Sequence, residues 1–194
     1  INQQKGLKNV LATVVFLEGS SYRKPGVRML ISEDLSSVGA VSGGCVEKEI
    51  IHRATTVFRD NKPKVITYDG RYKLGCEGIL YVLIEPFFVT AQFISAFSKA
   101  NSKRESLQLT SYFKKENEVF GEFGTSVTFE NRQQFAFTET VITKSDVAVY
   151  NQVLQPAFKL IIIGGEHDAV KLCKTASTLG WEVEIITSIK DSKQ

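Results

Sequence analysis

The stretch from residue 160 to residue 187 constrains the fold of this chain most strongly. An apolar run, 160–163, is followed by Gly164-Gly165 and then by apolar residues at helical spacing, which end at Gly180. A second apolar and β-branched run, 181–187, comes directly after it. This pattern predicts a βαβ unit. One such unit cannot cover its own sheet, so we expect the incomplete beginning of a Rossmann-like domain, whose remainder is missing here, disordered or supplied by a partner.

The amino-terminal half predicts a mixed α/β domain that precedes this unit. Apolar and β-branched runs indicate strands at 10–17, 27–31, 38–42, 64–68 and 79–84. The last of these is nearly continuous in apolar residues, which is typical of a strand covered on both faces, and Glu85-Pro86 is expected to mark its exit. Apolar residues at helical spacing predict helices at 46–58 and 91–100.

Between these two parts the hydrophobic period changes. From residue 107 to about 149, apolar residues alternate with polar ones, as at Leu107 and Leu109. Alternation of this kind predicts half-exposed antiparallel strands. We therefore expect a cofactor-handling domain at 1–100, an antiparallel extension or connecting region at 101–155, and the start of the Rossmann-like domain at 156–194.

Composition narrows the classes of function. The 24 basic and 21 acidic residues give a net charge of +3 without a basic run, which argues against nucleic acid or a membrane surface as partner. No stretch of 18 or so apolar residues occurs. Three cysteines in 194 residues are too few for a disulfide scaffold. We expect a soluble cytoplasmic protein with reduced thiols.

Three glycine-rich turns follow predicted strands in the amino-terminal half: 19–21, 42–45 and 74–78. Turns at strand ends form the sites of α/β proteins, and amides at a helix start bind anions. Hydroxyl and cationic side chains flank these turns, which suits a phosphate-bearing cofactor. The predicted cofactor-binding residues are Ser20, Ser21, Arg23, Lys24, Arg28, Ser42, Gly43, Gly44, Cys45, Gly75 and Cys76. The alternative is a set of ordinary turns with solvated basic residues.

Cys45 and Cys76 are the candidates for chemistry. A thiol in the first turn of a helix ionises more readily, as a thiolate ligand or a sulfur carrier must, and Cys76 has a similar glycine setting. The alternative is that both are small buried hydrophobic residues. Two thiols about 30 residues apart are not a metal motif, so no metal site is predicted.

A second candidate site lies in the βαβ unit. The stretch 164–169 can be aligned with the dinucleotide fingerprint, which makes Gly164, Gly165 and His167 candidates for nucleotide binding. Glu166, however, stands where that fingerprint has the glycine that approaches the pyrophosphate, and its bulk and charge oppose NAD(P). No hydrolase or phosphoryl-transfer motif is present.

The order and spacing of several blocks resemble the XdhC/CoxI family of accessory factors for xanthine dehydrogenase and carbon monoxide dehydrogenase type molybdoenzymes. Those blocks are GSSYRKPGVRMLI at 19–31, VGAVSGGCVE at 38–47 and LGCEGILYVLIEPF at 74–87. The stretch 160–186 is also similar to the Rossmann domain of that family, whereas 90–149 is only loosely covered.

The resemblance implies a protein that binds molybdenum cofactor as cargo, assists its sulfuration together with a cysteine desulfurase, and delivers it to a xanthine dehydrogenase type apoenzyme. It places the cysteines of the family at Cys45 and Cys76. A chaperone is expected more than a turnover enzyme, and a homodimer could complete the βαβ unit. The alternatives are an NAD(P)-linked oxidoreductase and a diverged scaffold relative without chemistry.

Overall fold

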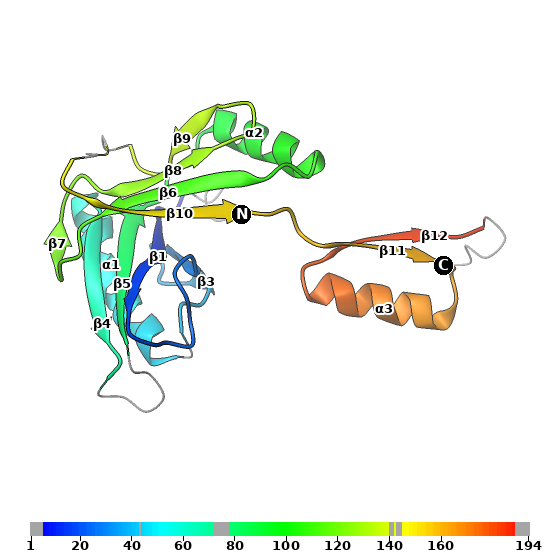
Figure 1. Ribbon diagram of the computed structural model, residues 1–194, viewed down its shortest axis with the longest axis horizontal. Helices are drawn as coiled ribbons and strands as arrows, with labels where there is room; N and C mark the ends of the chain where they lie inside the picture. The colour runs from blue at the N-terminus through cyan, green and yellow to red at the C-terminus, as the bar shows by residue number, and fades with distance from the viewer. Residues whose placement is uncertain (1–5, 43, 72–77, 140–141, 143–144, 189–194) are drawn as a thin grey trace.

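The computed structural model describes residues 6–42, 44–71, 78–139, 142 and 145–188. Two antiparallel sheets and two helices form the larger body, and a βαβ unit projects from one side of it (Figure 1). The predicted fold class, a mixed α/β protein, is confirmed.

Sheet A, the first sheet, is antiparallel throughout and has the strand order β3-β2-β1-β5-β4-β7. Its strands are β1 (Asn9–Glu18), β2 (Arg28–Ser32), β3 (Ser37–Gly39), β4 (Lys64–Asp69), β5 (Ile79–Pro86) and β7 (Val119–Phe120). Strand β3 is shorter than the predicted 38–42 because Gly39 adopts a φ of 87°, after which the chain turns toward α1.

Helix α1 (Cys45–Asp60) covers one face of sheet A. Its apolar residues recur every three or four positions, so they lie on one side and pack against β1 and β5. The four that are almost completely buried are Val46, Ile50, Ala54 and Val57. Asn61 ends the helix in the left-handed conformation, with a φ of 50°.

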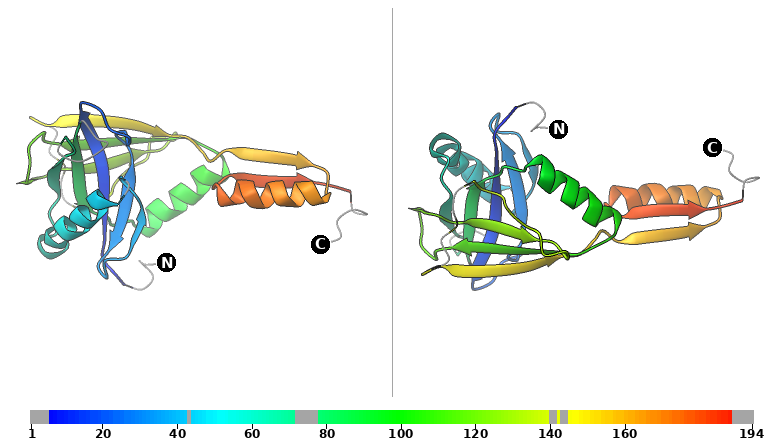
Figure 2. Two further views of the ribbon diagram at one scale, coloured as in Figure 1. Left: turned by 90° about the horizontal axis from the view of Figure 1, so that it is seen from below. Right: turned by 90° about the horizontal axis from the view of Figure 1, so that it is seen from above.

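Sheet B packs on the opposite face of sheet A, so that the larger body has three layers (Figure 2). Its strand order is β10-β6-β8-β9. The strands are β6 (Leu107–Phe113), β8 (Gly124–Thr128), β9 (Gln134–Ala136) and β10 (Ala148–Leu154). The first three fall in the stretch for which alternation predicts antiparallel strands, and β10 begins at the end of that stretch. Helix α2 (Ala91–Ser102) packs at the end of the space between the sheets.

The projecting unit consists of β11 (Lys159–Ile163), α3 (His167–Thr178) and β12 (Glu182–Ile186). Strands β11 and β12 pair in parallel, so this stretch is the predicted βαβ unit. Arg104, just after α2, ties the unit to the body: it pairs with Glu182 at 2.5 Å and donates to the carbonyl oxygen of Ala157 at 2.8 Å. Completion of the unit to a Rossmann-like domain stays a prediction.

Candidate cofactor site

The first glycine-rich turn meets Gly78, the described residue of the third turn, at one end of sheet A. Strand β1 ends at Glu18 opposite Ile79, where β5 begins, and β4 ends at Asp69 opposite the same residue. A Cβ atom built on Gly78 would lie 2.7 Å from the carbonyl oxygens of both Glu18 and Ser20. The chain around Gly78 therefore contacts the loop that follows β1, and this contact leaves room only for glycine.

The start of α1 lies at the same end. Strand β3 ends at Gly39 opposite Met29, next to the first residue of β2, and the chain then leads through Ser42 and Gly44 into the helix. In Figure 1 this is the lower end of β1 and β5. The topology thus gathers the loop 19–27, the start of α1 with Ser42 and Gly44, and the start of β5 in one region.

At the start of α1, Glu47 occupies the position in which the sequence predicts an anion. Its carboxylate accepts hydrogen bonds from the backbone amide of Ser42 at 2.6 Å, from the Ser42 hydroxyl at 2.9 Å and from the amide of Gly44 at 2.8 Å. Partial burial acts to raise the pKa of Glu47, but the hydrogen bonds from Ser42 and Gly44 together outweigh it and hold the pKa below its ordinary value. A cofactor anion at Gly44 would have to displace this carboxylate.

Replacing Glu47 with alanine is expected to destabilise the protein by about 1–2 kcal/mol, because the donors of Ser42 and Gly44 lose their acceptor. Since the pKa is lowered on folding, this stabilisation is present at neutral pH and is lost as pH falls through the folded value. Urea unfolding at pH 7 measures the effect. Glu49→Ala, on the same helix, removes only the exposed pair with Arg53 and should cost about 0.5 kcal/mol or less; equal losses in both variants would contradict the role given to Glu47.

The loop after β1 supplies accessible positive charge. Tyr22 is 82% exposed, and the guanidinium of Arg23 lies 5.1 Å from the centre of its ring. The Nε of Arg23 is buried and has no hydrogen-bond partner among the described residues. Ser20 and Lys24 are exposed, and Ser21 is half-buried. An anionic group at this loop could give Arg23 the acceptor that it lacks.

Arg28 differs from these residues because its guanidinium faces sheet B. Its Nη1 donates to the carbonyl oxygen of Gly26 at 2.9 Å and to Oε1 of Gln152 at 2.5 Å, and its Nε and Nη2 are buried. Burial lowers the pKa of Arg28, against the opposite influence of Tyr150 and Glu85. Its direct binding to a cofactor stays a prediction, and its hydrogen bonds hold the end of the basic loop.

Four predicted site residues receive no structural test. Gly43, Gly75 and Cys76 lie outside the described residues. Cys45 is the first residue of α1, but its side chain is also outside the described part. Among the described residues, no group of three or more His, Cys, Asp or Glu side chains could hold a metal ion.

The candidate nucleotide residues lie apart from this region, in the projecting unit (Figure 2). Gly164 has a φ of 121°, and its amide donates to the carbonyl oxygen of Ile186 at 2.9 Å. Glu166 is the N-cap of α3, and His167 begins that helix. The glutamate therefore stands at the helix start, where a pyrophosphate would bind, as the sequence predicts.

Glu85 is a buried polar residue at the end of β5, where the sequence predicts the exit of the strand. Strand β5 continues through Pro86, and Glu85 is 0% exposed between the two sheets. Its carboxylate accepts hydrogen bonds from the amide of Thr125 at 2.8 Å and from the Thr125 hydroxyl at 2.6 Å, and that hydroxyl also bonds with Ser111. A charged residue directly after six apolar strand residues was the available signal.

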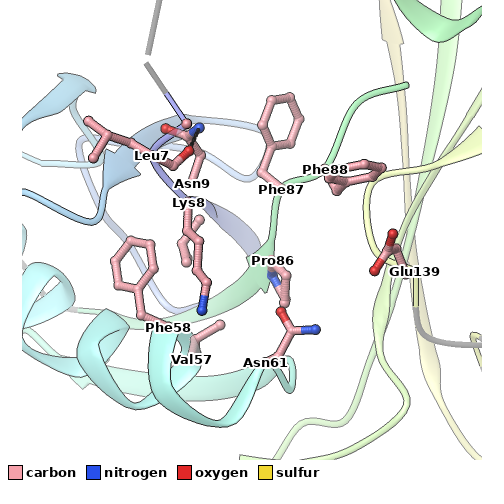
Figure 3. Close-up of a pocket in the computed structure, with 12 residues that line it drawn as sticks. Leu7, Lys8, Asn9, Val57, Phe58, Asn61, Pro86, Phe87, Phe88 and Glu139 are labelled. Carbon is pink, nitrogen blue, oxygen red and sulfur yellow. Dashed lines mark hydrogen bonds between the residues drawn. The ribbon is translucent and has the colours of Figure 1, made fainter. Parts of the chain in front are cut away.

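A cavity of about 530 Å³ lies at the opposite end of sheet A, near Asn9 and the end of α1 (Figure 3). Phe58, Phe87 and Phe88 give it apolar walls, and Lys8 and Glu139 contribute charge. None of the residues that line it is a predicted site residue. None of the helices in the described segments is both long and apolar enough to span a membrane.

A three-layer α/β body with a projecting βαβ unit is a fold that known proteins share. The chain aligns with a crystal structure of a xanthine dehydrogenase from Bacillus halodurans at a TM-score of 0.73 and 23% identity, over 95% of this chain and 59% of that one. It is also 27% identical over 192 residues to a probable xanthine dehydrogenase subunit of Bacillus subtilis (strain 168), and this alignment covers 90% of the chain and 58% of the relative.

Residues 3–69 match the model of the XdhC and CoxI family. Together with the relative from Bacillus subtilis, this match supports the similarity of the chain to the XdhC and CoxI family. The chain spans somewhat less than three fifths of the length of these two relatives.

Proposed function

We propose that the protein is an accessory factor that binds molybdenum cofactor as cargo at the glycine-rich end of sheet A. The observation that carries this proposal is the convergence of the loop after β1, the start of α1 and the start of β5 in one region. Arg23 and Lys24 supply charge for the pterin phosphate, and Ser20 and Ser21 supply hydroxyl donors. Gly43, Gly44, Gly75 and Ser42 complete the proposed binding set.

The proposed partners follow from the similarity to the XdhC and CoxI family and from the names of the relatives. A xanthine dehydrogenase type apoenzyme would receive the cofactor, and a cysteine desulfurase would supply sulfur. Cys45 and Cys76 would contact the molybdenum or its sulfur ligand as thiolates. We further propose a cytoplasmic homodimer.

An NAD(P)-linked oxidoreductase is the less favoured function. Glu166 is the N-cap of α3 and places a carboxylate where the dinucleotide phosphates would lie. Stabilisation of the protein by NAD(P) in a thermal melt would reverse this preference.

The test is an anaerobic titration of the purified chain with molybdenum cofactor, followed by pterin fluorescence. The double variant Arg23→Gln/Lys24→Gln should weaken binding at least roughly tenfold, because each cation contributes a charge-assisted interaction with the phosphate. Cys45→Ala tests the thiol in the same assay. Lys62→Gln removes an exposed cation near the far end of α1 and should bind like the wild type.

Absence of saturable binding by the wild-type chain would overturn the proposal for this segment of the family. If the double variant and Lys62→Gln bound the cofactor equally well, the protein would still be a cofactor-binding protein, but the basic loop would not be its binding site.

A further inference from the structure

Strand β10 lies at the edge of sheet B and directs every second side chain toward sheet A. Val149 and Val153 point outward and are about half exposed, whereas Tyr150 and Gln152 are half-buried. Both of these inward side chains reach Gly26, at the end of the basic loop. Residues more than 120 positions apart in the sequence therefore meet at the candidate cofactor site.

Gly26 fits this contact only because it lacks a side chain. Its φ is 98°, and a Cβ atom there would lie 2.6 Å from Nε2 of Gln152 and 2.6 Å from the hydroxyl of Tyr150. Its amide donates to the carbonyl oxygen of Val14 at 2.8 Å, which anchors the loop on β1. Strand β10 thus packs directly against the backbone of the loop.

Arg28 connects the two elements. One nitrogen of its guanidinium, Nη1, donates both to the Gly26 carbonyl and to Gln152. The other two nitrogens have no hydrogen-bond partner among the described residues, and no described carboxylate forms an ion pair with Arg28. Gln152 is therefore the one described side chain that fixes the guanidinium by a hydrogen bond, and the guanidinium in turn holds the loop.

We propose that Gln152 is a positioning residue of the cofactor site, which holds the basic loop 19–26 through Arg28 and thereby sets the affinity of the loop for an anionic cofactor. The effect of Gln152 on cofactor affinity rests on the proposed function. The role of Gln152 in holding the loop concerns the protein alone, so it can be tested without any ligand.

The experiment compares Gln152→Ala, Gln152→Glu and Val153→Ala by hydrogen exchange and by cofactor titration. Gln152→Ala should raise the exchange rate of the Gly26 amide roughly tenfold, because Arg28, which holds the loop through the Gly26 carbonyl, loses its charge-assisted hydrogen bond to Gln152. Gln152→Glu keeps an acceptor for Arg28 and should retain slow exchange. Val153→Ala changes an outward side chain on the same strand and should leave the exchange rate unchanged. Amides of α1 serve as the internal reference for global stability.

Cofactor titration then distinguishes the positioning of the loop by Gln152 from its effect on cofactor affinity. Faster Gly26 exchange in Gln152→Ala together with at least fivefold weaker binding of molybdenum cofactor supports the whole proposal. Faster exchange with wild-type affinity would overturn the control of affinity. Faster exchange in a chain whose wild type binds no cofactor would retain the positioning role and overturn the proposed function instead. Unchanged exchange at Gly26 would overturn the positioning role itself.

Discussion

Replacing Glu85 with glutamine should abolish a loss of stability that the wild-type protein undergoes as pH rises from about 4.5 to about 7. Burial raises the pKa of Glu85 to about 7, against the opposite influence of the Thr125 hydrogen bonds and of Arg28. Between the unfolded and folded values, the native state holds a proton that the unfolded chain releases. The free energy of unfolding therefore falls through this window, by about 3 kcal/mol at most, and stays lower above it.

Glutamine keeps the shape of the side chain but does not titrate. Its carbonyl oxygen can accept from the Thr125 amide, and its amino group can donate to the Thr125 hydroxyl. Relative to the wild type, Glu85→Gln is expected to gain stability between pH 5 and pH 8. Urea unfolding at both pH values measures this difference, and Glu139→Gln, at an exposed glutamate, is the matched control. Parallel profiles of the wild type and Glu85→Gln would show that Glu85 does not titrate in this range.

Local pattern was sufficient to predict α1. Its four innermost residues recur at the spacing of one helical face, and burial follows that spacing because this face packs on sheet A. The predicted strand 38–42 was wrong at its end, because the positive φ of Gly39 terminates pairing with β2. The positive φ of Gly39 depends on the tight turn into α1. The spacing of hydrophobic residues in the sequence does not indicate such a turn.

The contacts of Arg28 could not be predicted, since they depend on how two sheets stack. Arg28 and Gln152 are 124 positions apart, and nothing in either segment indicates that β10 will pass over the basic loop. The sequence groups Arg28 with Arg23 and Lys24 because all three are basic and close in the chain. The structure separates them, since Arg28 lies on a strand and points to the inner face of sheet A, whereas Arg23 and Lys24 belong to the loop.

The same limitation applied to Glu85, and for a related reason. The pair Glu85-Pro86 predicts the end of the strand, and β5 does end at Pro86, but the pair does not indicate that the carboxylate is buried against a donor from another element. Thr125 provides that donor from β8, 40 positions further along the chain. Buried polar groups of this kind form hydrogen bonds with residues that are distant in the sequence. The spacing of hydrophobic residues does not predict such tertiary contacts.

Phe93→Ala is expected to be among the most destabilising substitutions in the larger body, at about 3 kcal/mol. Phe93 is a half-buried α2 residue that packs into the core between the sheets, and its ring lies 5.6–6.0 Å from the rings of Phe129, Phe135 and Phe137. All three contacts have the edge-to-face geometry that adds to the effect of burial. Truncation would leave a cavity among these rings, and urea unfolding at pH 7 measures the loss.

Phe97→Ala is the matched control, one turn further along α2. Its ring stacks on Phe93 at 5.9 Å but is 43% exposed, so its removal should cost about 1 kcal/mol or less. A cost for Phe97→Ala as large as that of Phe93→Ala would mean that the outer face of α2 is also covered in solution. The structure instead assigns the stability of this end of the molecule to the inner face of α2, because only that face reaches the aromatic cluster between the sheets.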